Sequence, residues 1–188
     1  MYWFGTLKRL CLLATFVCLP TGYARAEEFS ARLDGFEELG AQNAESGAIL
    51  SNGTGTLELN LDRRAGTLTY TLSYSNVGAT PPGTGTVTQA HIHFGKEHAA
   101  GGIIVFLCTN LENGPSGTPT CPANSGTVSG TIIAASIIAI AKQNVGAGDF
   151  DALIDALTSH TAYANVHTTA FPAGEIRGQV RGLDDEGR

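Results

Sequence analysis

Three histidines are spaced so that strand periodicity could bring their rings together. His91 and His93 are separated by one residue in a segment that alternates like a β-strand. Side chains at positions i and i+2 of a strand project from one face, about 6.5–7 Å apart. His167 lies in a later strand-like segment and adds a third imidazole if the two strands meet. Because neutral imidazoles bind copper or zinc at ~2.0–2.1 Å, the spacing predicts a metal site whose affinity falls below about pH 6.

His98 follows His93 across Gly95 and is a candidate fourth ligand. A different interpretation fits the same residues, because a His-x-His pair on a strand can also hydrogen-bond to loops or face solvent. The sequence therefore leaves a metal site and a purely structural role for the histidines open.

Glu175 and Arg177 alternate near the C-terminus and are predicted to face the same side of a strand. They form either a polar group beside the histidines or, as the favoured interpretation, an ion pair that holds the last strand in register. The chain contains neither a Gly-x-Ser-x-Gly nucleophile elbow nor a Gly-rich phosphate loop with Lys. With no catalytic residues identified, enzymatic activity stays uncertain and a non-enzymatic role is favoured.

The first 26 residues have the organisation of a secretory signal peptide. Lys8 and Arg9 precede an apolar run that is too short for the ~20 residues that cross a bilayer, and Ala24-Arg25-Ala26 forms a small-x-small cleavage site. Cleavage after Ala26 predicts a secreted or periplasmic protein. We expect one domain over residues 27–183, a polar tail over 184–188 and no membrane span in the mature chain.

Two of the four cysteines, Cys108 and Cys121, lie beyond the expected cleavage site. A single pair in an exported chain predicts a disulfide, which closes a loop of about 14 residues and contributes up to ~3 kcal/mol. Two metal-binding thiols are the alternative, but neither cysteine has a His or Cys neighbour at ligand spacing.

Charge excludes one class of partner. The chain carries a formal net charge of −6, and because the first 26 residues hold three basic residues and no acidic one, the mature chain carries −9. Binding to nucleic-acid phosphates needs arrays of Lys and Arg, so nucleic acid is not expected as a partner. The sequence does not identify the extracellular or periplasmic partner.

Short alternating segments separated by turn residues indicate a mainly β protein. We expect strands over 31–33, 54–61, 67–74, 87–94, 103–108, 126–133, 163–168 and 175–180. A helix is expected over 149–158 with Asp149 as its N-cap, and a second short helix over 135–142. The strand pattern predicts an antiparallel β-sandwich of Greek-key or immunoglobulin-like type, with an open α+β sheet as the alternative.

Two blocks of the sequence are distinctive. The first block is Ala90-His91-Ile92-His93-Phe94-Gly95, and the second runs from Tyr163 through Asn165 and His167 to Phe171-Pro172-Ala173-Gly174-Glu175-Ile176-Arg177-Gly178-Gln179-Val180. Both blocks resemble the CHRD domain, a family named after the secreted animal protein chordin and also found in exported bacterial proteins. The Leu107-Cys108-Thr109-Asn110 and Cys121-Pro122 stretches are similar to bacterial members. The resemblance implies an extracellular β-sandwich and marks the three histidines as motif positions.

The resemblance does not assign a reaction, because function depends on the site and not on the fold. Growth-factor binding does not carry over, since chordin has further cysteine-rich modules. A fainter likeness is to copper/zinc superoxide dismutase, which also has a His-x-His strand and a later His, but this chain lacks a second ligand set for zinc. We therefore expect a non-enzymatic extracytoplasmic binding or structural module. The alternative is a copper or zinc protein that uses His91, His93 and His167 and has dismutase-like chemistry.

Overall fold

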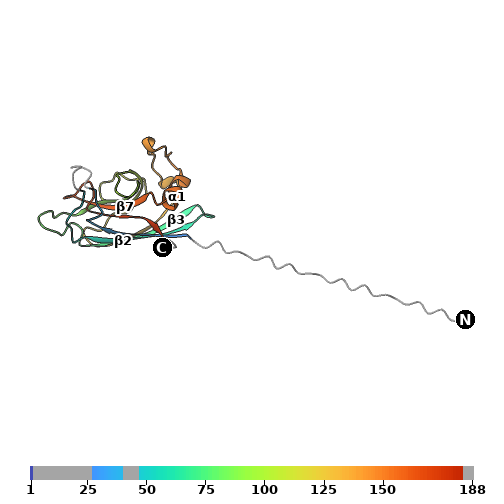
Figure 1. Cartoon of the computed structure of the whole chain (residues 1–188), viewed down its shortest axis with the longest axis horizontal. Coiled ribbons are helices and arrows are strands. Elements are labelled where there is room, and N and C mark those ends of the chain that lie inside the picture. Colours follow the sequence, from blue (N-terminus) through green and yellow to red (C-terminus); the bar gives the residue numbers. More distant parts are fainter. Residues whose placement is uncertain (2–26, 40–46, 184–188) are drawn as a thin grey trace.

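The computed structural model describes Met1 and residues 27–39 and 47–183 (Figure 1). The expected signal peptide and the expected tail over 184–188 lie outside these residues, apart from Met1. None of the helices in the described part of the chain has the length and apolar character needed to cross a membrane.

The described residues form nine strands, one α-helix and two short 3₁₀ helices. In chain order these are β1 (Glu27–Asp34), β2 (Thr54–Asp62), β3 (Thr67–Ser75), β4 (Val87–Phe94), β5 (Gly102–Thr109), β6 (Gly126–Ile132), η1 (Ala134–Ser136), η2 (Ala141–Gln143), α1 (Phe150–Thr158), β7 (Ala162–Thr168), β8 (Ile176–Gln179) and β9 (Arg181–Gly182).

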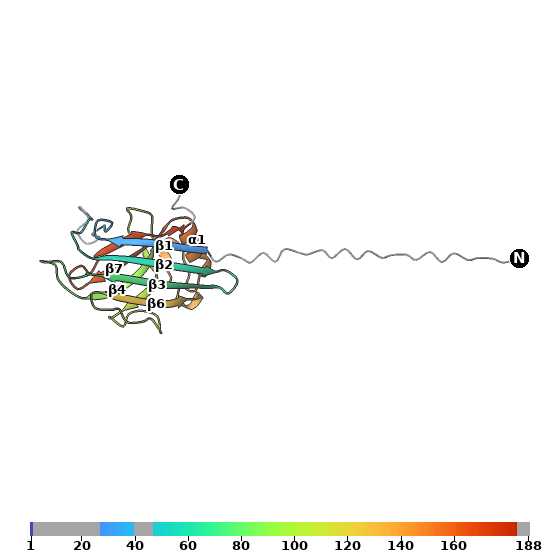
Figure 2. The ribbon, with the colours of Figure 1, turned by 90° about the horizontal axis from the view of Figure 1, so that it is seen from below.

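All the strands belong to one antiparallel sheet that folds over itself. The strand order is β5-β4-β7-β8-β1-β2-β3-β6, and β9 pairs with β1 off this path. Figure 2 shows β1, β2, β3 and β6 side by side in one layer, with β4 and β7 behind them. The path joins the layers between β8 and β1, so β5 and β6 are its two ends. The expectation of a mainly β, antiparallel fold is confirmed.

Alternating residues in β2 and β3 explain why this hairpin forms. Leu57 pairs with Leu72 and Leu61 with Leu68, so the apolar side chains of both strands point to one face. The turn between them places Gly66 at φ +64°, a conformation that favours glycine. Burial of these leucines against the second layer builds one side of the core.

The second layer supplies the other side of the core and leaves its opposite face for polar groups. Ala90 and Ile92 of β4 and Ala164 and Val166 of β7 are fully buried members of the core cluster. Successive strand residues point to opposite faces, so the residues between them face away from the core. His91, His93 and His167 therefore lie on the outer face of this layer.

The helix prediction over 149–158 is confirmed. Asp149 caps α1, and its Oδ1 accepts a hydrogen bond of 3.0 Å from the Ala152 N–H. The second helix expected over 135–142 is wrong as a continuous helix, because the chain forms η1 and η2 there. Between them the Ile138 N–H donates to the Ile104 carbonyl, which covers part of the β5 edge.

Candidate metal centre

The pairing of β4 with β7 brings the three histidines together. His91 lies opposite Asn165, and Gln89 lies opposite His167. His167 is therefore two residues along β7 from the position opposite His91, on the same face of the sheet. One ligand nitrogen from each ring can be chosen so that all three atoms lie within 4.8 Å of one another. The structure thus gathers the three residues that sequence spacing singles out.

On its other edge β4 pairs with β5, and this pairing is irregular at the same two histidines. Phe106 of β5 pairs with His91 and Ile103 with His93, while the register shifts next to each histidine. These bulges leave Leu107 and Ile104 as extra residues on β5. The Phe106 ring then packs edge-on against His91, with 4.3 Å between ring centroids.

Loops bury the cluster although it lies on an outer sheet face. His91 is 0%, His93 7% and His167 6% exposed. His93 Nδ1 lies 3.0 Å from the Gly101 carbonyl, and His167 Nδ1 lies 3.0 Å from the Pro172 carbonyl. Because a carbonyl only accepts, each bond places the proton on Nδ1 and leaves the Nε2 lone pair for another partner.

Two ring nitrogens lack the partners that buried polar atoms normally have. His91 Nε2 and His93 Nε2 are buried without a hydrogen bond. His91 Nδ1 and His167 Nε2 lie 3.1 Å apart, and His167 Nε2 is also 2.9 Å from Asn165 Oδ1. A neutral ring carries one proton, so His167 cannot donate to Asn165 and Pro172 at once. A cation bound at Nε2 would assign that proton to Nδ1.

Burial keeps the imidazoles neutral. Desolvation is the main cause that lowers the pKa of His91 to about 2, and the neighbouring His167 and His93 add to it. Desolvation also lowers the pKa of His93 to about 4 and lowers that of His167. The rings are thus deprotonated at neutral pH, as metal ligands must be.

Tyr163 and Arg177 support His93. The Tyr163 ring stacks on His93 with 4.7 Å between centroids and 4° between planes, and the Arg177 guanidinium carbon lies 3.5 Å from the centroid of the Tyr163 ring. Arg177 also donates to the Lys96 and Ala99 carbonyls. These bonds hold the loop whose Gly101 carbonyl orients His93.

Glu175 and Arg177 do not form the ion pair that the sequence favoured. Glu175 is fully buried and its carboxylate accepts hydrogen bonds from Ser51 Oγ, the Gly78 N–H and Thr168 Oγ1. Arg177 instead contacts Tyr163 and the loop carbonyls beside the histidines. Arg177 therefore belongs to the polar group around the site, whereas Glu175 joins the segments around Ser51 and Gly78 to Thr168 of β7.

Glu38 is a neighbour of the site that sequence reasoning missed. Its side chain is 5% exposed, and burial raises the pKa of its carboxyl to about 7, against the opposing effects of the Leu39 N–H, Arg177 and Asn165. A Cβ at Gly174 would overlap Glu38 Oε1 and come within 2.8 Å of Asn165 Nδ2. Glu38 lies in a segment without periodicity, so no sequence pattern pointed to it. Tyr163 could have been found, since it shares a strand face with Asn165 and His167.

His98 lies apart from the cluster. Its side chain is 77% exposed on the loop after β4, where Nε2 is 4.0 Å from a Glu97 carboxylate oxygen. The three buried rings are the group that the described residues offer to a metal, and His98 is not part of it.

The disulfide between Cys108 and Cys121 is confirmed, with 5.1 Å between the Cα atoms, so these sulfurs are not thiol ligands. The bridged loop is also joined to β4, because Asn110 Nδ2 donates to the Val87 and Cys121 carbonyls. The disulfide thus holds the β5 end next to the strand that carries His91 and His93.

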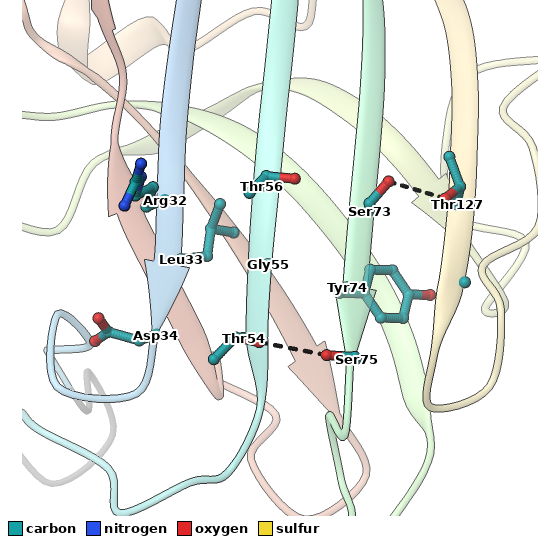
Figure 3. Close-up of a pocket in the computed structure, with 11 residues that line it drawn as sticks. Arg32, Leu33, Asp34, Thr54, Gly55, Thr56, Ser73, Tyr74, Ser75 and Thr127 are labelled. Atoms are coloured by element: carbon teal, nitrogen blue, oxygen red, sulfur yellow. Dashed lines mark hydrogen bonds between the residues drawn. The ribbon is translucent and has the colours of Figure 1, made fainter.

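One depression of the surface lies away from the histidines. It has a volume of about 650 Å³ and lies on the β1-β2-β3-β6 layer (Figure 3). Two cross-strand rows of polar residues border it: Arg32, Thr56, Ser73 and Thr127 in one row, and Asp34, Thr54 and Ser75 in the other. Hydroxyl pairs such as Ser73 with Thr127 bond to each other across the strands. Asp34 is the acidic residue of this open trough, and among the described residues no cluster of His, Cys, Asp or Glu forms there.

The fold and the site together define a mainly β domain with a buried trihistidine cluster on an outer sheet face. The model of the CHRD domain family matches residues 29–180, and the chain belongs to this family. No curated protein and no solved structure matches the chain.

Proposed function

We propose that this CHRD-domain protein is an extracytoplasmic, non-enzymatic module that binds copper or zinc through His91, His93 and His167. The observation that carries the proposal is the convergence of three buried neutral imidazoles, within 4.8 Å, with ring nitrogens that lack a protein partner. Buried polar atoms without partners are rare and need a physical reason. A bound cation supplies one.

The spacing of the nitrogens fits one ion. Two nitrogens bound at ~2.0–2.1 Å lie roughly 3.3–3.6 Å apart at tetrahedral or trigonal angles. The nitrogens here include a pair 3.1 Å apart, and the set of three spans up to 4.8 Å. Ring rotations that move one nitrogen by about 1 Å would close the set. The Gly101 and Pro172 carbonyls already orient His93 and His167, which is the usual role of groups behind metal-binding histidines.

Export is supported by independent features of the chain. The Lys8-Arg9 region, the apolar run and Ala24-Arg25-Ala26 fit a signal peptide cleaved after Ala26, which leads to the periplasm or the exterior. The Cys108–Cys121 disulfide fits an oxidising compartment. We also infer that the folded-over sheet works as a Greek-key or immunoglobulin-like sandwich, which is supported by the crossings that place β6 beside β3 and β7 beside β4.

Elemental analysis tests the proposed function. The oxidised protein, exported by the expressing cell and purified after exposure to copper and zinc salts, should hold close to one copper or zinc ion per chain. His93→Ala should lose that ion, whereas His98→Ala, which changes an exposed ring outside the cluster, should retain it. Metal-free protein under these conditions, or equal metal content in both variants, would refute the proposal.

Dismutase-like redox chemistry is the second candidate, favoured only if the bound ion is copper. Superoxide and peroxide assays on the copper-loaded protein test it directly. Inactivity of a stoichiometric copper complex would leave metal holding as the function.

A further inference from the structure

The charges around the three histidines bear on which ion they hold. The ligand group consists of three neutral imidazoles, and within the described residues no carboxylate or thiolate belongs to it. An ion bound there keeps its full charge, because no anionic ligand neutralises it. The identity of the ion then depends on how costly that charge is in the buried site.

The surroundings make an uncompensated charge costly. His91 is fully buried, and the apolar ring of Phe106 packs against it at 4.3 Å. Burying an ion costs desolvation free energy that rises with the square of its charge, so a dication costs about four times as much as a monocation of equal radius. The site therefore penalises Zn²⁺ and Cu²⁺ far more than Cu⁺.

Arg177 adds to this selection. Its guanidinium lies 3.5 Å from the centre of the Tyr163 ring, which stacks on His93, so a fixed positive charge lies beside the ligand group. Glu38 is the buried acid on this side, but it is not in the ligand group, and Arg177 offsets its charge. The fixed charges beside the rings thus do not offset the charge of a bound dication.

The number of ligands points the same way. Zinc in proteins is almost always four-coordinate, with an open fourth position for water where only three residues bind it. The described residues bring three imidazoles together, and their exposures of 0%, 7% and 6% leave little room for a solvent ligand. Cuprous ion is stable with three nitrogen ligands in a trigonal arrangement and needs no fourth.

We propose that the His91–His93–His167 site selects monovalent copper, and that it does so through the ion's charge and low coordination number rather than through ligand type. This inference rests on the proposed metal-binding function and deepens it. It also implies that a cupric ion entering the site would be held more weakly than a cuprous one, which favours the reduced state of bound copper.

Competition titrations on the full oxidised protein test the selection. Cu⁺ is delivered anaerobically against a chromophoric cuprous chelator, and Zn²⁺ and Cu²⁺ are each titrated against their own chromophoric chelators. We expect one Cu⁺ per chain and Zn²⁺ affinity at least 100-fold weaker. Binding of Cu²⁺ relative to Cu⁺ is read independently from the reduction potential of the copper-loaded protein, which should be higher than that of aqueous copper.

A matched pair of variants separates charge from shape. Phe106→Glu places a carboxylate next to His91. Phe106→Gln places an uncharged side chain of nearly the same size as Glu at the same position. Because opposite charges attract more strongly in a buried site, Phe106→Glu should tighten Zn²⁺ binding at least tenfold relative to Phe106→Gln, with a smaller effect on Cu⁺. Circular dichroism and thermal unfolding establish that both variants are folded.

The outcomes distinguish this inference from the function on which it rests. If no metal binds the wild-type protein, the metal-binding function fails and the selection fails with it. If Zn²⁺ or Cu²⁺ binds as tightly as Cu⁺, metal binding stands and the selection is overturned. Equal Zn²⁺ affinities for Phe106→Glu and Phe106→Gln would overturn the electrostatic cause.

Discussion

His91 Nδ1 and His167 Nε2 lie 3.1 Å apart, although 76 positions separate the two residues in the chain. The β4–β7 pairing produces this contact, and the carbonyl of Pro172 fixes the second nitrogen of His167. Groups that are held so closely, buried and neutral, respond to protons, to neighbouring side chains and to metal in ways that can be measured.

The metal-free protein should lose stability as the pH falls below 6.5. Unfolded histidines accept a proton near pH 6.5, whereas burial lowers the pKa of folded His91 to about 2 and of His93 to about 4. Protonation thus favours the unfolded chain, and stability present above pH 6.5 is lost towards pH 4. Urea unfolding at pH 7 and pH 4.5 with a chelator present should differ by ~2–3 kcal/mol for each of the two rings.

His91→Gln should reduce this pH dependence, because it removes one of the three buried rings whose pKa is lowered. His98→Gln changes an exposed ring and should leave the dependence as in the wild type. An identical pH dependence for His91→Gln and the wild type would contradict the assignment.

Glu38→Gln should stabilise the protein at pH 8 relative to the wild type by ~1–3 kcal/mol, with a smaller gain at pH 5. Burial raises the folded pKa of Glu38 to about 7 from an ordinary 4.5. The stability that the protonated carboxyl contributes is therefore present below pH 4.5 and is lost as the pH rises through 7. Thermal unfolding at the two pH values measures the difference. Glu37→Gln is the control, since Glu37 is exposed, and an equal response of both variants would argue against a buried Glu38.

Asn165→Ala should weaken metal binding roughly 10–100-fold while the protein remains folded. The Asn165 Oδ1 atom lies 2.9 Å from His167 Nε2 and helps to set the position of that ring. Affinity is measured by competition with a chelator. Asn60→Ala, on the exposed side of β2, provides the comparison. Unchanged affinity in Asn165→Ala would show that the amide does not position the ligand.

Gly174→Ala should destabilise the protein by more than ~2 kcal/mol, because it combines φ +132° with overlap of the new Cβ and Glu38 Oε1. Gly66→Ala also has a positive φ, but its Cβ would meet open space, so it should cost only about 1 kcal/mol. Chemical unfolding compares the two. Equal costs would mean that the Glu38 contact relaxes freely.

Much of the strand layout could be predicted because it depends on local alternation. Leu57, Leu59 and Leu61 define a half-buried strand by spacing alone, and Asp149 marks a helix start by its side-chain chemistry. The isoleucines near 137–140 are β-branched and disfavour the helix expected there, and contacts of this segment with β5 decide its backbone. Local sequence contains no information on such contacts.

In the candidate site, too, local spacing predicts some features and contacts between distant segments determine the others. That His91 and His93 share a face follows from strand periodicity, but the proximity of His167 depends on which strands pair and in what register. Arg177 was assigned to an ion pair because alternation alone placed it next to Glu175. Its contact with Tyr163 depends on the register of β8 against β7, and Glu38 reaches the site from a segment without any period.

The three imidazoles protrude from the side of their layer that does not form the apolar interior. Because these rings are not part of the apolar core between the layers, we expect the chemistry of the site and the integrity of the scaffold to evolve largely separately. Duplicated copies of such a domain could acquire different ligands by substitutions at the outward-facing positions of β4 and β7. For the same reason the domain is a suitable scaffold for designed sites, because new side chains can be introduced one position at a time.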